Sequence, residues 1–211
     1  MLPAMGTFRT VASTAEAEID KIKGSRFLGA VWPAADAAQA QEILAARRAA
    51  HRDATHNCWA WRFGLDPEAR RSSDDGEPSG TAGRPILQEI DGRRLTDLLV
   101  VVTRYYGGTK LGTGGLLRAY SEAAAAVLDA ARVVEVAITR RLEISFDYDL
   151  TGPVMAVLAA FRLAPGPARY DARASLLLEV PEEEEEALRR SLRDATTGRI
   201  LLAPQDRPEA R

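Results

Sequence analysis

Leu98-Leu99-Val100-Val101-Val102 is the most apolar strand-like segment of this chain. A short aliphatic run rich in β-branched residues is typical of a strand that is buried on both faces. We therefore predict a central strand over residues 98–103, with helices covering at least one side of it. Working outward, the segments before and after this strand have the most unusual local composition in the chain.

Two glycine-rich loops flank the strand. The first reads Asp74-Asp75-Gly76-Glu77-Pro78-Ser79-Gly80-Thr81-Ala82-Gly83-Arg84-Pro85, and the second reads Arg104-Tyr105-Tyr106-Gly107-Gly108-Thr109-Lys110-Leu111-Gly112-Thr113-Gly114-Gly115. Glycine is required where the backbone takes a positive φ or closely approaches another group. Ordinary surface loops need few such positions, so we interpret the two loops together as the candidate functional site.

The second loop leads into a helix predicted to start near Gly115, where apolar residues recur with helical spacing. Backbone N–H groups at a helix N-terminus attract anions. The loop is not a Walker A loop, because no Gly-Lys-Ser or Gly-Lys-Thr follows at the right spacing. It is not a dinucleotide fingerprint either, because Leu117 stands where the last glycine of that fingerprint is needed. A tight turn with a purely architectural role is the alternative. The predicted anion- or ligand-binding residues are Arg104, Gly107, Gly108, Thr109, Lys110, Gly112, Thr113, Gly114 and Gly115.

The first loop brings three carboxylates into four residues. They are Asp74, Asp75 and Glu77. Carboxylates so placed can hold Mg²⁺ with water, act as an acid–base pair, or form a structural network with nearby cations. We favour the structural network, with Arg84, Arg104 and Lys110 as its cations. Together with the hydroxyls of Ser79 and Thr81, for which no partner base is identifiable, Asp74, Asp75, Glu77 and Arg84 make up a supporting loop. No catalytic residue, metal ligand or cofactor is assigned.

The segment 55–63 alternates as a strand. One face carries Asn57, Trp59, Trp61 and Phe63, and the other carries His56, Cys58, Ala60 and Arg62. The aromatic stripe is interpreted as core, with a base-stacking surface as the alternative. His56 and Cys58 share a face, but at roughly 6–7 Å they lie beyond direct hydrogen-bond reach of each other. Two such ligands also fall short of a zinc site.

The remainder of the chain indicates two domains, which we place at residues 1–134 and 135–211. The second shows the order β-α-β-β-α-β, typical of a ferredoxin-like module. In the first, a capping box at Asp36 and Gln39 precedes an Ala-rich helix to Ala50, and a short helix over 86–91 is framed by proline and glycine. Residues 64–73 are expected to be a polar connection.

Bulk composition excludes several classes of protein. Of the 211 residues 46% are hydrophobic, which is typical of a globular protein. The net charge is −2, so no global basic field attracts nucleic acid and any such contact is local. Cys58 is the single cysteine, which fits a reducing compartment. No secretory signal and no apolar run long enough to span a membrane is evident. We expect a cytoplasmic protein without a membrane partner.

Four blocks of the sequence resemble the Impact N-terminal domain family, the group that includes bacterial YigZ. They are Lys23-Gly24-Ser25-Arg26-Phe27, His56-Asn57-Cys58-Trp59-Ala60, the acidic loop from Asp74 to Gly83, and the block from Arg104 to Leu116. The resemblance covers roughly residues 16–130. The family commonly has lysine where Gly24 stands and often histidine where Asn57 stands, which weakens any argument for a histidine-based metal site.

This resemblance implies an α/β (α+β) protein of two domains. The N-terminal domain would be like the second domain of a small-subunit ribosomal protein, with a left-handed β-α-β crossover. The ferredoxin-like C-terminal domain would resemble the last domain of elongation factor G. Because eukaryotic members regulate translation, it also implies a non-catalytic regulator that binds RNA, the ribosome or a translation factor. The alternative is an enzyme acting on a phosphorylated small molecule at the two loops.

Overall fold

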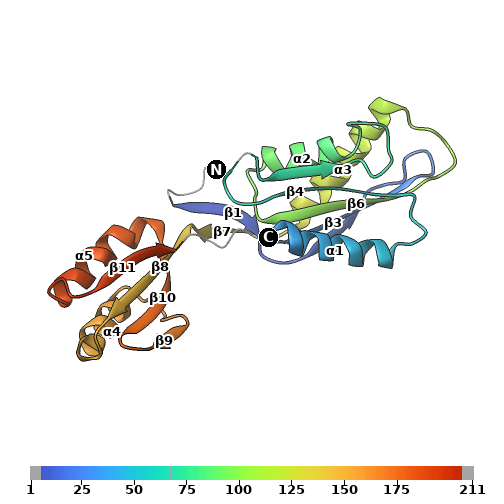
Figure 1. Ribbon diagram of the computed structural model, residues 1–211. Helices are drawn as coiled ribbons and strands as arrows, with labels where there is room; N and C mark the ends of the chain where they lie inside the picture. Colours follow the sequence, from blue (N-terminus) through green and yellow to red (C-terminus); the bar gives the residue numbers. More distant parts are fainter. Residues whose placement is uncertain (1–5, 67, 206–211) are drawn as a thin grey trace. The chain divides into compact units, whose positions relative to one another are not determined.

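The computed structural model describes residues 6–66 and 68–205 of the chain (Figure 1). These residues divide into two compact units. Among the described residues, the first unit runs from Phe8 to Val136, and the second contains Gly6, Thr7 and residues 137–205. A short ladder pairs β1 (Thr7–Val11) with β7 (Val133–Ala137). Each unit is described by itself below.

The first unit is built on a five-stranded antiparallel sheet. In sheet order its strands are β2 (Ala15–Glu18), β3 (Arg26–Pro33), β6 (Leu98–Tyr105), β4 (His56–Arg62) and β5 (Arg70–Ser73). Every residue of β6 except Tyr105 is buried. The prediction of a central, doubly covered strand is therefore confirmed.

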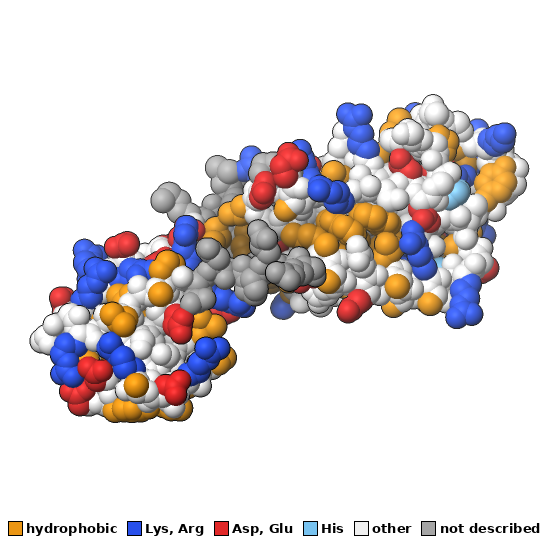
Figure 2. All heavy atoms as spheres, viewed as in Figure 1, with side chains coloured by type: hydrophobic (Ala, Val, Ile, Leu, Met, Phe, Trp, Pro, Cys, Tyr) orange, Lys and Arg blue, Asp and Glu red, His pale blue; other side chains and the backbone are white. Residues whose placement is uncertain are grey.

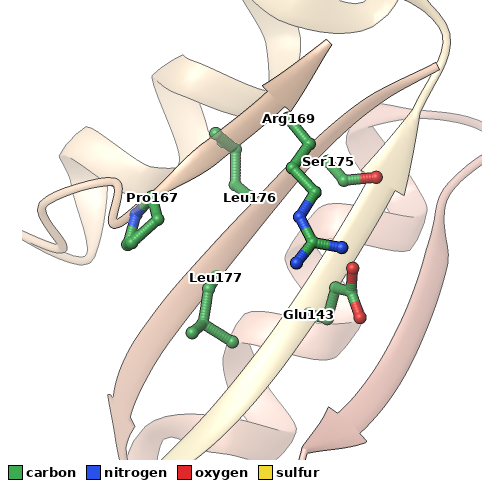
Figure 3. Close-up of a pocket in the computed structure, with 6 residues that line it drawn as sticks. All are labelled: Glu143, Pro167, Arg169, Ser175, Leu176 and Leu177. Carbon is green, nitrogen blue, oxygen red and sulfur yellow. The ribbon is translucent and has the colours of Figure 1, made fainter. Parts of the chain in front are cut away.

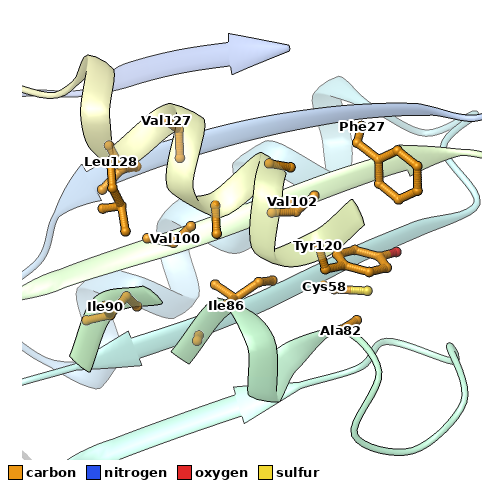
Figure 4. Close-up of a cluster of buried hydrophobic side chains, with 14 of the residues drawn as sticks. Phe27, Cys58, Ala82, Ile86, Ile90, Val100, Val102, Tyr120, Val127 and Leu128 are labelled. Carbon is orange, nitrogen blue, oxygen red and sulfur yellow. The ribbon is translucent and has the colours of Figure 1, made fainter. Parts of the chain in front are cut away.

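Helices cover both faces of this sheet. The helices α2 (Gly83–Gly92) and α3 (Thr113–Ala130) lie on one face, and α1 (Ala37–Ala50) lies on the other (Figure 1). Between the sheet and the α2–α3 layer lies the larger core, in which Ile86, Val100, Val102 and Tyr120 meet (Figure 4). A smaller core beneath α1 contains Trp61, Leu99 and Val101, among others.

Helix and strand boundaries differ from the sequence expectations in a few places. The connection 64–73 is not entirely irregular, because its last four residues form the edge strand β5. Residues 83–85 already belong to α2, which was expected to begin at Ile86. The Asp36 side chain caps α1 as predicted, accepting from the Gln39 N–H at 2.9 Å, whereas the Gln39 side chain accepts from Ala35 and not from Asp36.

The second unit has the predicted β-α-β-β-α-β order. Its elements are β8 (Thr139–Phe146), α4 (Thr151–Ala160), β9 (Ala168–Tyr170), β10 (Ala174–Pro181), α5 (Glu185–Ala195) and β11 (Leu201–Gln205), with short 3₁₀ turns at Tyr148–Leu150 and Glu182–Glu184. The antiparallel sheet has the order β11-β8-β10-β9. Both helices pack on the same apolar face of this sheet, as Val154, Leu158, Leu188 and Leu192 share one core.

No helix within the described ranges has the length and apolar character needed to cross a membrane. Lys and Arg side chains are interspersed with Asp and Glu over the visible face of both units (Figure 2).

Candidate functional site

A buried ion pair joins the two glycine-rich loops. Arg104 Nη1 donates to Glu77 Oε1 at 2.5 Å, and the two side chains are only 5% and 4% exposed. The Tyr120 hydroxyl donates to the same carboxylate oxygen at 2.7 Å. An unpaired charge is costly at a buried position, so the charge on each of these two side chains is stabilised by the other. The structural network favoured from sequence is therefore present between Glu77 and Arg104.

The guanidinium of Arg104 is enclosed on its other sides as well. Its Nη2 donates to Ser25 Oγ at 3.3 Å. The central carbon of the guanidinium, Cζ, lies 5.4 Å from the ring centres of both Phe27 and Tyr106, within cation–π range. Arg104 was predicted to bind an anion, and the structure places its charge inside the unit, against Glu77.

Asp74 caps the start of α2. Its carboxylate accepts from the backbone N–H groups of Gly80, Ala82 and Gly83 at 2.8, 2.9 and 2.9 Å. Partial burial alone would raise the pKa of Asp74, but the three N–H groups outweigh that effect and hold the pKa below its usual value. The ionised carboxylate therefore stabilises this loop.

We expect Asp74→Asn to lose about 1–2 kcal/mol of stability at neutral pH, because the amide would turn an NH2 donor toward the Gly80 N–H and remove the negative charge beside the N-terminus of α2. Because the folded-state pKa is depressed, the carboxylate contributes fully above about pH 4, near its unfolded pKa, and the contribution is lost as pH falls through the folded value. Urea unfolding at several pH values should show the two proteins converging below pH 4. Parallel curves down to pH 2 would contradict this role.

Asp75 is also engaged within the unit. Its carboxylate pairs with Arg48 of α1 and accepts from the Asn57 N–H at 2.7 Å. Its backbone carbonyl lies 2.7 Å from His56 Nδ1, so Nδ1 carries the proton and donates. The other ring nitrogen of His56, Nε2, then faces Glu77 Oε1 at 3.9 Å.

Cys58 has no access to solvent. Its Sγ donates to the Asp74 carbonyl at 3.0 Å, and burial raises the pKa of the thiol far above its usual value. The thiolate is the nucleophilic form, so Cys58 is unreactive near neutral pH. The burial of Cys58 and its bond to the Asp74 carbonyl therefore argue against a role for Cys58 as a nucleophile activated by His56. Among the described residues, no group of three or more His, Cys, Asp or Glu side chains is placed to hold a metal.

The loop after β6 is anchored at its first glycine. The Gly107 N–H donates to Ser25 Oγ at 3.2 Å, and a Cβ at Gly107 would lie 1.9 Å from the carbonyl carbon of Gly24. Gly108 and Gly112 have φ values of +87° and +74°, a region that favours glycine. The loop beyond Gly107 is exposed, including Thr109, Lys110, Thr113 and Gly114.

The two helix N-termini of this layer differ. Asp74 occupies the N-terminus of α2, whereas α3 begins after Gly112 with no side-chain cap. Lys110 precedes that open end and Arg118 follows it, both exposed.

Arg84 and Lys110 form no ion pair within the described ranges, so of the three cations expected to pair with the acidic loop only Arg104 does so. In that loop Ser79 is exposed, and Thr81 Oγ1 donates to the Pro78 carbonyl at 2.6 Å.

The aromatic stripe of β4 belongs to the core. The Trp59 and Trp61 rings stack at 4.1 Å, and Trp61 stacks on Phe63 at 5.7 Å. They pack with residues of α1 such as Leu44. Since Trp61 is buried and the half-buried Trp59 and Phe63 pack against the same core, the core interpretation is supported over a base-stacking surface.

Sequence reasoning missed three participants. Tyr120 and Ser25 hold the Glu77–Arg104 pair, and Arg48 pairs with Asp75. Ser25 lies in one of the four family-like blocks, which was its only sequence signal.

A hollow on the sheet of the second unit was also not predicted, and in it Arg169 and Glu143 point toward one another (Figure 3). The hollow is lined by Glu143, Pro167, Arg169, Ser175, Leu176 and Leu177.

Comparisons with known proteins agree with these blocks. The Impact N-terminal domain matches residues 23–128, and a domain of unknown function, DUF1949, matches residues 144–199. The IMPACT family member YvyE of Bacillus subtilis is 36% identical over 92% of this chain and 88% of its own length. Escherichia coli YigZ, also an IMPACT family member, is 42% identical over 48% of this chain and 51% of its own length.

A crystal structure described as that of a hypothetical protein has the same overall fold. It superposes with a TM-score of 0.77 and 28% identity, covering 96% of this chain and 99% of the other. The chain therefore belongs to the IMPACT family.

Proposed function

We propose that this IMPACT family protein is a non-catalytic, translation-linked regulator that binds RNA. In this proposal the loop from Gly107 to Gly115 receives RNA phosphates. The observation that carries it is the exposed, uncapped N-terminus of α3 beside a neighbouring helix whose N-terminus is already occupied by Asp74. A helix of 18 residues presents a full positive dipole end to an anion.

The side chains around this loop support phosphate binding. Lys110 and Arg118 are exposed and have no ion-pair partner among the residues with described positions, so their charges are available to a ligand. Thr109 and Thr113 add exposed hydroxyl donors. Phosphate contacts from Lys, Arg, Thr and backbone N–H groups are the usual way in which proteins hold a nucleic-acid backbone.

The internal use of the acidic loop supports a binding role over catalysis. Asp74, Asp75 and Glu77 each accept hydrogen bonds from the protein itself. An enzyme acting on a phosphorylated small molecule would need one of these carboxylates as a base or metal ligand, and would have to give up part of the fold to free it. The rival function therefore has less support, although the same loop could hold its phosphate.

The test is RNA binding measured by fluorescence anisotropy with a labelled single-stranded oligomer. Wild type is expected to bind, and Lys110→Ala to bind several-fold more weakly on every sequence, because phosphate contacts carry no base specificity. Arg190→Ala removes an exposed cation of the second unit and serves as the matched control, with unchanged affinity. Turnover of a sugar phosphate or nucleotide without RNA binding would support the enzyme instead.

A further inference from the structure

We infer that Tyr106 is a stacking platform for one nucleobase of a single-stranded nucleotide segment whose phosphate lies at the adjacent glycine loop. This inference rests on the proposed function, since the phosphate site is the one described above. It adds the chemistry of the ligand: an unpaired base must accompany the phosphate. A duplex hides its base faces and would not satisfy the site.

The position of Tyr106 is unusual for an aromatic residue. It is 45% exposed, although its ring lies over the guanidinium of Arg104 at 5.4 Å. The preceding residue, Tyr105, points to the other side of the sheet, where its hydroxyl lies 2.7 Å from His51 Nδ1. Tyr105 is thus used within the fold, while Tyr106 has one ring face over a buried cation and much of its remaining surface in solvent.

The backbone holds Tyr106 in place on both sides. Its N–H donates to Thr55 Oγ1 at 3.0 Å. The next residue, Gly107, crosses Gly24 so closely that no side chain fits between them. An exposed aromatic ring on a fixed backbone loses little conformational freedom when it binds, which makes it a preorganised contact surface.

Two segments next to Tyr106 carry exposed cations. Lys23 lies in the turn that packs on Gly107, and Lys110 lies in the loop that follows. Both are exposed, and neither forms an ion pair in the described part of the chain. The charge of Arg104 is already neutralised by Glu77, so it supports the ring without competing for the phosphate. An exposed aromatic ring on a segment that also carries exposed cations is the combination with which proteins bind single strands.

Other aromatic residues do not offer this combination. The rings of Trp59, Trp61 and Phe63 stack on one another. Tyr148 and Tyr170 belong to the second unit, and the Tyr148 hydroxyl is bonded to the Asp171 carbonyl. Tyr106 is therefore the ring that the first unit presents beside its glycine loop.

The test compares three labelled probes on the full chain: a single-stranded RNA decamer, an abasic ribose-phosphate decamer of equal charge, and a mononucleotide. Wild type is expected to bind the RNA about 5- to 150-fold more tightly than the abasic strand, the range for one stacked base. Tyr106→Leu should remove that difference, and Tyr106→Phe should keep it. Binding of the mononucleotide with the same dependence on Tyr106 would identify a free nucleotide as the source of the base.

The outcomes separate the two proposals. Equal binding of RNA and abasic strand by wild type would overturn the stacking inference and leave the phosphate site standing. Absence of binding to all three probes would overturn both. Because the probe comparison is made on the wild type, it remains decisive if Tyr106→Leu fails to fold.

Discussion

Replacing Gly107 with alanine is expected to lower the free energy of unfolding by about 3 kcal/mol or more. The new Cβ would lie 1.9 Å from the Gly24 carbonyl carbon and 2.2 Å from the Ser25 nitrogen. Both are backbone atoms and cannot rotate away, so either the turn at 23–25 or the end of β6 must move. Urea denaturation followed by circular dichroism measures the loss.

Gly114→Ala is the matched control in the same loop. A Cβ there meets no heavy atom within 4 Å, and Gly114 lies in the first turn of α3. Alanine is favoured over glycine in helices by up to about 1 kcal/mol, so stability should be unchanged or slightly raised. Equal stability of the two variants would show that the crossing of Gly107 and Gly24 is looser than described.

Arg104→Met is expected to destabilise the first unit by about 3–5 kcal/mol, because it leaves the buried Glu77 carboxylate without its cation. The double variant Glu77→Gln/Arg104→Met removes both charges and should recover much of this loss. Urea unfolding of the three proteins measures the effect.

An exposed pair provides the control for the buried one. Arg140 and Glu182 form an ion pair in which the side chains are 60% and 40% exposed. Arg140→Met should therefore cost less than about 1 kcal/mol. If Arg104→Met cost no more than Arg140→Met, the Glu77–Arg104 pair would not be the buried centre of the site.

Local periodicity explains what the sequence predicted well. The aliphatic run of β6 predicted a strand buried on both faces, and the alternation along β4 predicted a strand with two different faces. Both predictions are confirmed. The order of elements in the second unit was also predicted. The edge strand β5 was missed because Arg70-Arg71-Ser72-Ser73 is polar throughout, as edge strands often are. The early start of α2 depends on Asp74, whose side chain reaches forward to Gly83.

The hydrogen bonds and ion pairs between residues of the site were less predictable. Sequence spacing showed three carboxylates near several cations, but not that Asp74 would cap a helix, Asp75 would meet Arg48 and Glu77 would meet Arg104. The partners of Asp75 and Glu77 lie in α1 and β6, which are far from this loop in the chain and close to it only after folding. A pattern within one loop carries no information about these two long-range contacts.

The most direct test of the account is the salt dependence of RNA affinity in wild type and Lys110→Ala. If the loop from Gly107 to Gly115 holds phosphates, the logarithm of the association constant should fall linearly with the logarithm of salt concentration. Lys110→Ala should reduce that slope by about 0.7 to 1, the change expected for one lost phosphate contact. An unchanged slope, or affinity that does not respond to salt, would contradict the phosphate site.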